Sequence, residues 1–98
     1  MKKYNCLVNG RHFLIEIHGK VKRQGFYKWV SVEAENEKLA EEKAVNFIRT
    51  DKNITNITKN TAKNSPMLFL DKIEESQEDM NARGYSFYPE KKWWQIWK

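Results

Sequence analysis

The sequence predicts a small α+β protein. We expect an antiparallel sheet of three to four strands in the order β-β-β-α-β, with one main helix packed on one face and an aromatic C-terminal tail. Three observations predict this class. The stretch Gly25–Arg49 combines a strand pattern with a helix pattern, an Asn9-Gly10 pair lies between two apolar segments, and a further apolar run spans Met67–Ile73.

The first expected element is a hairpin whose turn is Asn9-Gly10, between strands Tyr4–Val8 and Arg11–Ile17. An Asn-Gly pair supplies the two positive-φ residues that a type I′ turn requires. Cross-strand partners share a face of the sheet, so this register predicts which side chains the helix covers. They are Tyr4, Cys6, Val8, Phe13, Ile15 and Ile17.

The second part is a strand that leads directly into the helix. Strict alternation is typical of a half-buried strand, because successive side chains point to opposite faces. One predicted face holds Phe26, Val30, Val32 and Ala34 with Lys28 interrupting, and the other holds Tyr27, Trp29, Ser31 and Glu33. Asn36 is the expected N-cap. The apolar stripe of the helix is expected to be Ala40, Ala44, Phe47 and Ile48, which recur at helical spacing.

The rest of the chain is less regular. Ile54 and Ile57 are expected to pin part of the polar connection Thr50–Pro66 down as a short helical turn. The run Met67–Ile73 is apolar on both sides, which predicts an interior strand or a face used by a partner. Glu74–Gly84 is expected to be a loop or a short helix.

Composition predicts one domain, residues 1–90, followed by a tail, residues 91–98. The chain has 98 residues, 40% hydrophobic and 32% charged, with one cysteine. It has no run of about 18 apolar residues, and hence no expected membrane span. The single Cys6 excludes an internal disulfide, and we expect a cytoplasmic location.

The net charge of +5 is unevenly distributed. Residues 1–28 carry seven basic and one acidic side chains, residues 29–90 carry eight and twelve, and residues 91–98 carry three lysines. Lys20, Lys22 and Arg23 lie in an expected basic connection, where they are candidates for contact with nucleic acid through its phosphates. The same pattern also fits a sheet whose edge is guarded by lysine.

The tail is the main candidate for partner binding. Three of the four tryptophans lie in the last six residues. The candidate partner-binding residues are Trp93, Trp94, Trp97, Lys91, Lys92 and Lys98. Tryptophan beside lysine suits an anionic membrane surface, a groove in a protein partner or stacking on unpaired bases. Alternatively, the tail folds back over an open face of the sheet.

No motif indicates catalysis, a metal or a cofactor. The expected register places Cys6 on the opposite face from His12 and His18. A zinc site needs about four ligands, and no C-x-x-C or H-x-x-x-H spacing supplies the others. Cys6 also has no adjacent base that would make it a nucleophile. We therefore expect a protein that is not an enzyme.

Two resemblances follow from short segments. The V-E-A-x-x-x-x-x-A-E-E-x-A run of Val32–Ala44 is similar to the strand-to-helix joint of half-RNase-H-like domains of the HicB antitoxin type. The K-Y-x-C-L-V-N-G run of Lys3–Gly10, with Gly25-Phe26-Tyr27 and Val32-Glu33-Ala34, resembles a group of small uncharacterised bacterial proteins. The expected β-β-β-α-β order also looks like that of these domains, and this resemblance implies a regulatory, antitoxin-like role. The second brings no functional residues.

These observations favour a non-catalytic interaction module that docks on a protein partner or a membrane surface through its sheet and its Trp/Lys tail. The alternative is a protein that binds RNA or single-stranded DNA, or an antitoxin-like regulator. A homodimer is compatible with either, because exchange of a terminal segment is a low-cost route to dimers.

Overall fold

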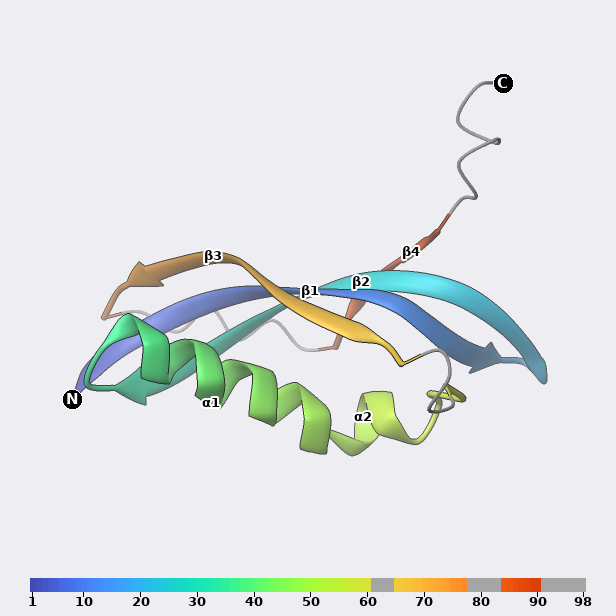
Figure 1. Cartoon of the computed structure of the whole chain (residues 1–98), viewed down its shortest axis with the longest axis horizontal. Helices are drawn as coiled ribbons and strands as arrows, with labels where there is room; N and C mark the ends of the chain where they lie inside the picture. Colours follow the sequence, from blue (N-terminus) through green and yellow to red (C-terminus); the bar gives the residue numbers. More distant parts are fainter. Residues whose placement is uncertain (61–64, 78–83, 91–98) are drawn as a thin grey trace, which may run out of the picture.

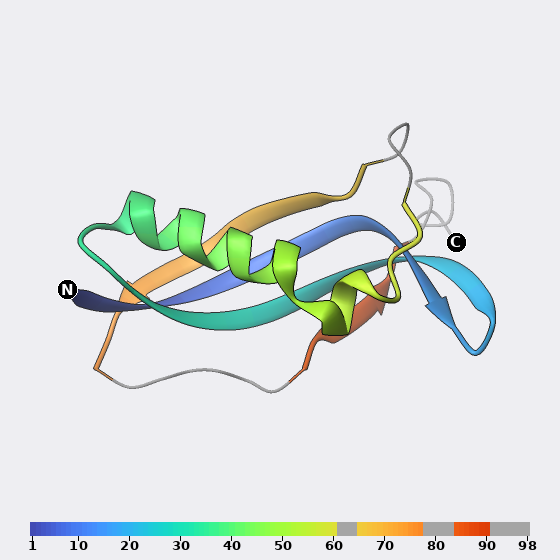
Figure 2. The ribbon, with the colours of Figure 1, turned by 90° about the horizontal axis from the view of Figure 1, so that it is seen from below.

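The computed structural model describes residues 1–60, 65–77 and 84–90 of the chain. It confirms the predicted class: a four-stranded antiparallel sheet, in the order β3-β1-β2-β4, carries one main helix on one face (Figures 1 and 2). The elements are β1 (Lys2–Ile17), β2 (Lys20–Ala34), α1 (Glu37–Thr50), α2 (Lys52–Thr55), β3 (Met67–Glu75) and β4 (Ser86–Pro89). Two strands, and not three, therefore precede the helix, so the predicted order β-β-β-α-β is wrong.

The error lies at the predicted turn. Asn9 and Gly10 lie in the middle of β1, paired with Tyr27 and Phe26 of β2. The chain turns instead at His18 and Gly19, which have φ values of 53° and 77°, the positive-φ pair that a tight two-residue hairpin turn uses. The predicted basic connection at residues 20–25 is consequently the first part of β2, and the hairpin arm is long (Figure 1).

A bulge in β1 explains why the predicted core face is nevertheless largely correct. The register shifts between Gly10 and Phe13, and His12 has a φ of 60°. An extra residue on one strand reverses the alternation of side chains, as the predicted turn would have done. The buried members of the predicted face are Tyr4, Cys6, Val8, Phe13 and Ile15. Ile17, at the hairpin tip, is 38% exposed.

The helix begins where predicted. The Asn36 side chain accepts a hydrogen bond from the Leu39 amide at 2.9 Å, as an N-cap does. Ala40, Ala44 and Ile48 are buried against the sheet, whereas Phe47 is 47% exposed, so its predicted place in the apolar stripe is wrong. The alanines allow close approach: the Cys6 thiol lies 4.0 Å from the Ala40 carbonyl oxygen.

The C-terminal half completes the edges of the sheet. Among the strands that the structure describes, β3 pairs with β1 alone and lies at the edge of the sheet, so its predicted interior position is wrong. A register shift opposite Leu7 and Val8 turns Leu68, Leu70 and Ile73 toward the helix side. Ile54, predicted to pin a helical turn, is buried in α2.

β4 was not predicted as a strand. It pairs with residues 24–27 of β2 and is tied to the helical layer by Tyr85, whose hydroxyl donates to Asp51 Oδ2 at 2.6 Å. Burial, and then this hydrogen bond, raise the pKa of the Tyr85 phenol above its ordinary value. The neutral phenol therefore holds β4 to the junction of α1 and α2.

Candidate functional site

The sheet face turned away from α1 is the candidate site, and we call it the open face. In Figure 1 the described helices lie together below the sheet and leave its upper side uncovered. The register of the four strands turns a set of apolar and aromatic side chains toward this side. They are Leu7, Tyr27, Trp29, Met67, Phe69 and Tyr88.

The centre of the open face is hollowed into a shallow groove of about 460 Å³ that runs from β3 to the start of β4. Leu7, Tyr27 and Trp29 line its floor, and Lys72 and Ser86 lie at its sides. Tyr27 is 41% exposed and Phe69, on β3, is 40% exposed. Large aromatic surfaces that remain this accessible on one side of a sheet are typical of binding sites.

A buried polar network supports this face from within. The Asn9 side chain is 2% exposed, and its amide nitrogen donates to the Phe26 carbonyl at 3.0 Å and to the Tyr88 hydroxyl at 2.9 Å. Its carbonyl oxygen accepts from Arg11 Nε at 2.7 Å. The Arg11 guanidinium also lies 5.1 Å from the centre of the Phe69 ring. The network fixes the positions of Arg11 and Tyr88, and it provides hydrogen-bond partners for the buried side-chain amide of Asn9.

Glu90 lies where the face meets the hairpin arm. Its carboxylate accepts from the backbone amide of His12, at the bulge, at 2.7 Å and lies 3.4 Å from Arg23 Nε. Arg23 also contacts the ring of His12. Glu90 thus satisfies the amide that the bulge frees from the ladder, and it places the last described residue at the rim of the open face.

The three residues predicted to contact nucleic acid, Lys20, Lys22 and Arg23, have different surroundings in the structure. Lys20 and Lys22 are exposed near the tip of the hairpin, whereas Arg23 is held by Glu90. The predicted partner-binding residues of the tail, Lys91, Lys92, Trp93, Trp94, Trp97 and Lys98, lie outside the described residues. Sequence reasoning missed the roles of Asn9, Arg11 and Glu90. The one signal for the open face was the alternation that placed Tyr27 and Trp29 together.

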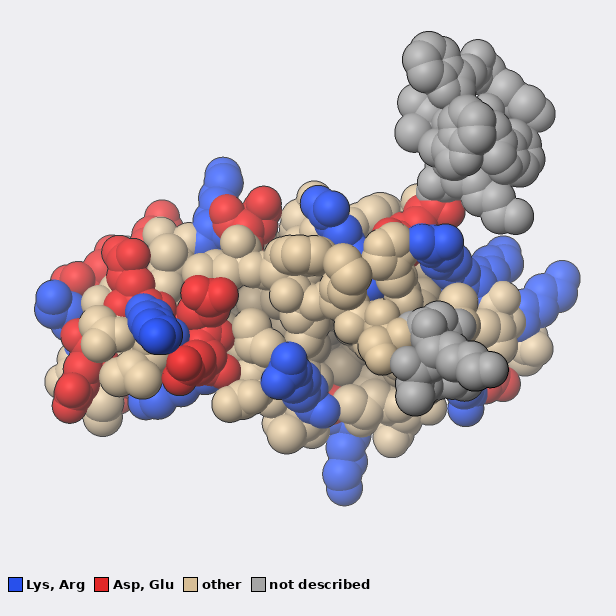
Figure 3. Space-filling model, in the orientation of Figure 1, with Lys and Arg blue, Asp and Glu red and all other residues tan. Residues whose placement is uncertain are grey.

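Charge is polarised along the strands, and Figure 3 shows acidic side chains gathered toward one end of the molecule. Seven carboxylates and four cations lie at the end where α1 begins. They are Glu33, Glu35, Glu37, Glu41, Glu42, Glu74 and Glu75, and Lys2, Lys3, Lys38 and Lys43. Five cations and two carboxylates lie around the bulge and the hairpin tip. They are Arg11, Lys20, Lys22, Arg23 and Lys59, and Glu16 and Glu90. We call these the acidic end and the basic end.

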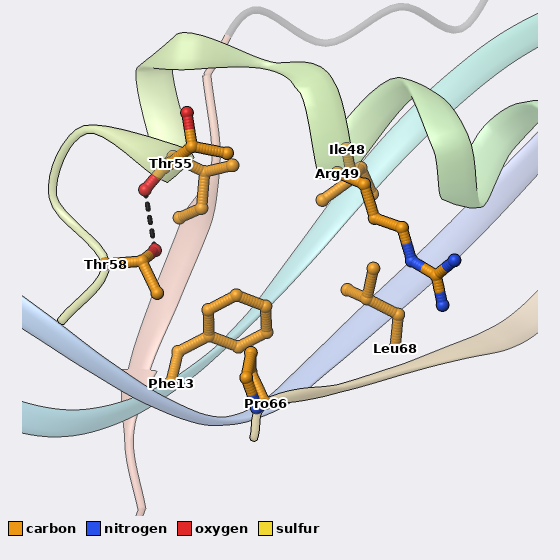
Figure 4. A pocket seen from close by; sticks show the side chains of 8 residues that line it. Phe13, Ile48, Arg49, Thr55, Thr58, Pro66 and Leu68 are labelled. Atoms are coloured by element: carbon orange, nitrogen blue, oxygen red, sulfur yellow. Dashed lines mark hydrogen bonds between the residues drawn. The ribbon is translucent and has the colours of Figure 1, made fainter. Parts of the chain in front are cut away.

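A second hollow lies on the helix side. It has a volume of about 280 Å³ between the end of α1, α2 and the start of β3 (Figure 4). Phe13, Ile48 and Leu68 form its apolar lining, and Arg49 extends beside Leu68. The Thr58 hydroxyl at its far side donates to the Ile54 carbonyl at 2.6 Å. Its volume is near the lower bound of about 300 Å³ for small-molecule pockets.

The residues considered for catalysis or metal binding do not meet. Cys6 is buried beneath α1, whereas His12 lies at the bulge and His18 in the hairpin turn. Among the described residues, no three His, Cys, Asp or Glu side chains are grouped so that they could hold a metal ion. Burial, and then the negative charge of Glu41, raise the pKa of the Cys6 thiol from 9.0 to about 11. A thiol in this state is a poor nucleophile near neutral pH.

The Cys6 pKa predicts an alkaline loss of stability. The unfolded thiol ionises near pH 9.0, whereas the folded thiol keeps its proton until about pH 11. The contribution of Cys6 to stability is therefore fully present below pH 9 and is lost as the pH rises from 9 to 11. We expect the free energy of unfolding, measured by urea titration, to fall across this window. The slope between pH 9 and 10 should flatten in Cys6→Ala; an unchanged slope would contradict this assignment.

Comparison with known proteins places the chain in no group. No family model, no curated protein and no solved structure matches it. In the part of the chain that the structure describes, no helix is long and apolar enough to cross a membrane. The site itself is therefore the basis for the function proposed below.

Proposed function

We propose that this protein is a non-catalytic interaction module that docks on a partner protein through its open face. The observation that carries the proposal is the groove floored by Leu7, Tyr27 and Trp29, on the one side of the sheet that no described helix covers. The proposal also includes the Trp/Lys tail, residues 91–98, which lies outside the described residues.

The charges around the groove favour a protein over a membrane or a nucleic acid. Asp71 and Lys72 lie together at the groove, and Glu74 follows on the same strand. Carboxylates at this position repel anionic lipid headgroups and phosphates, whereas mixed charges around an apolar centre are typical of protein–protein interfaces. The neutralisation of Arg23 by Glu90 further weakens the case for nucleic acid.

Photo-crosslinking from matched positions tests the proposal. p-Benzoylphenylalanine is placed at Tyr27, on the open face, or at Phe47, on the outer surface of α1, in the full chain inside cells. The two sites are 41% and 47% exposed, so they are comparable in accessibility. We expect a protein adduct of discrete mass from position 27 only. A second substitution, Phe69→Glu, should reduce that adduct at least tenfold.

The controls define the opposite result. Lys38→Glu, on the exposed surface of α1, should leave the adduct from position 27 unchanged. Equal adducts from positions 27 and 47, or an adduct that Phe69→Glu does not reduce, would contradict the proposal. An adduct made only of lipid or RNA would assign the face to one of those partners instead.

A further inference from the structure

We infer that the hollow on the helix side of the sheet is a binding site for a small monocarboxylate, a molecule with one short apolar chain or ring and one carboxylate. The inference goes beyond the proposed docking function, because this hollow lies between the sheet and the helical layer, on the opposite side from the open face (Figure 4). Three observations carry it: the walls of the hollow belong to the core, an arginine beside it has no partner among the described residues, and the hollow adjoins a more polar one.

The walls of the hollow are side chains of the hydrophobic core. Phe13 of β1, Ile48 of α1 and Ile54 of α2 are all buried, and Pro66 and Leu68 close the side toward β3. Because these walls come from several elements, the tertiary fold holds the shape of the hollow. An apolar space of this kind holds water poorly and accepts apolar ligands, so the entry of an alkyl chain or a ring is favourable.

Of the described residues that line the hollow, only Arg49 is charged. Figure 4 shows its side chain reaching from the end of α1 to beside Leu68. Among residues 1–60, 65–77 and 84–90, the Arg49 guanidinium makes no hydrogen bond or ion pair. An arginine at a helix end often binds the last carbonyl oxygens. Here the Thr50 hydroxyl donates to two of them, at 3.0 and 3.2 Å, and the Asp51 amide donates to a third, at 3.2 Å. The guanidinium is therefore available to an anion.

The carboxylates near Arg49 do not cancel its charge at the hollow. Asp51 follows closely in the sequence, but its carboxylate already accepts two hydrogen bonds, at 2.6 and 3.0 Å. Glu42 is two turns before Arg49 on α1, about 10 Å along the helix axis, and Glu41 is farther. This separation is near the Debye length of about 10 Å at 0.1 M salt, so the interaction between these exposed charges is largely screened. The potential at the hollow is therefore positive.

A second, adjoining hollow gives the ligand carboxylate access to water. It has a volume of about 420 Å³ and shares Arg49 and Leu68 with the first hollow, and Lys38 and Asn46 also line it. A carboxylate at Arg49 thus lies at the border between an apolar and a polar space. It can accept charge-assisted hydrogen bonds from the guanidinium without the cost of burying a charge completely.

The size of the apolar hollow limits the ligand and its affinity. A volume of about 280 Å³ is near the lower bound for small-molecule sites, so it admits one short chain or one ring. Octanoate meets this description and serves as the probe. For a ligand of this size we expect a dissociation constant on the order of 0.1 mM.

Nuclear magnetic resonance of the full chain, labelled at its isoleucine methyl groups, tests the site. We expect octanoate to shift the methyl signals of Ile48 and Ile54, which line the hollow, in a saturable way. The methyl signal of Ile17, at the hairpin tip, is the internal control and should not shift. Octan-1-ol has the same chain without the carboxylate, and it should bind at least fivefold more weakly.

Charge reversal at matched positions of α1 tests the role of Arg49. Arg49→Glu should weaken octanoate binding at least tenfold and leave octan-1-ol binding unchanged within twofold. Lys38→Glu is the control, because Lys38 is exposed on the same helix and lines only the adjoining hollow. It should leave octanoate binding unchanged within twofold. Leu68→Trp should fill the hollow and abolish the saturable shifts, with circular dichroism confirming that each variant is folded.

The opposite results are equally specific. The absence of saturable shifts at Ile48 and Ile54 would overturn the site. Equal affinities for octanoate and octan-1-ol, or octanoate binding that Arg49→Glu does not weaken, would overturn the assignment of a carboxylate ligand. Tyr27→Glu, on the open face, should leave octanoate binding unchanged, and a loss of binding in this variant would place the site on the open face instead. The inference and the docking function therefore fail separately.

Discussion

Replacement of Gly10 by alanine is expected to lower the free energy of unfolding by about 3 kcal/mol. A Cβ atom at this position would lie 2.2 Å from Cε2 of Phe26 and 2.8 Å from Cε1 of Phe13, well inside van der Waals contact. Both rings are buried in the core, so neither can move aside without displacing its neighbours, and overpacking of this kind costs about 1–3 kcal/mol. Urea titration of the full chain measures the change.

Gly19→Ala is the matched control. Gly19 occupies the hairpin turn with a φ of 77°, and nothing lies within 4 Å of the position that its Cβ would take. The expected cost is about 1 kcal/mol, from the left-handed backbone alone. If Asn9-Gly10 were a turn on the surface, Gly10→Ala would cost about the same as Gly19→Ala. Equal losses would therefore contradict the continuous β1 strand.

The largest effect is expected for Phe26→Ala, at about 4 kcal/mol. Phe26 is fully buried, and its ring centre lies 4.8 Å from that of Phe13, 4.9 Å from that of Tyr85 and 6.0 Å from that of Phe87. Truncation removes the apolar contacts and leaves a cavity, which together cost about 3–5 kcal/mol for a buried phenylalanine. Urea titration reports the loss, and near-ultraviolet circular dichroism reports the change in aromatic packing.

The same substitution should also weaken docking, because Phe26 joins β4 to the core. The ring contacts of Tyr85 and Phe87 hold β4, which carries Tyr88 of the open face and leads to Glu90. Phe47→Ala is the control: this ring is 47% exposed, and its loss should change stability by no more than about 0.5 kcal/mol. Similar losses for the two variants would show that Phe26 is not the centre of the core.

The features that follow from the sequence are those encoded by neighbouring residues. The strand ending at Ala34 has its two faces as predicted, because alternation persists over the whole segment and one side must be buried. The Asn36 cap and the helix after it are also as predicted, because an N-cap acts on amides only a few residues away. These local patterns suffice for the α+β class.

Tertiary structure decided how these pieces are joined and what they expose. Asn9-Gly10 carries a strong local turn signal, yet it lies in mid-strand, because the Phe26 ring fills the space of the missing side chain and the buried Asn9 amide gains several partners. His18-Gly19 supplies the positive-φ pair that a hairpin turn requires, at the C-terminal end of β1. Phe47 fits the helical stripe but is exposed, because the width of the contact with the sheet, and not the periodicity, determines which side chains are covered.

The open face illustrates the same limit. The alternation placed Tyr27 and Trp29 on one side, but Phe69, Tyr88 and Glu90 reach that side only through the pairing of β3 and β4 with distant strands. Such pairings depend on the burial of residues far apart in the sequence, and a pattern among neighbouring residues does not encode them.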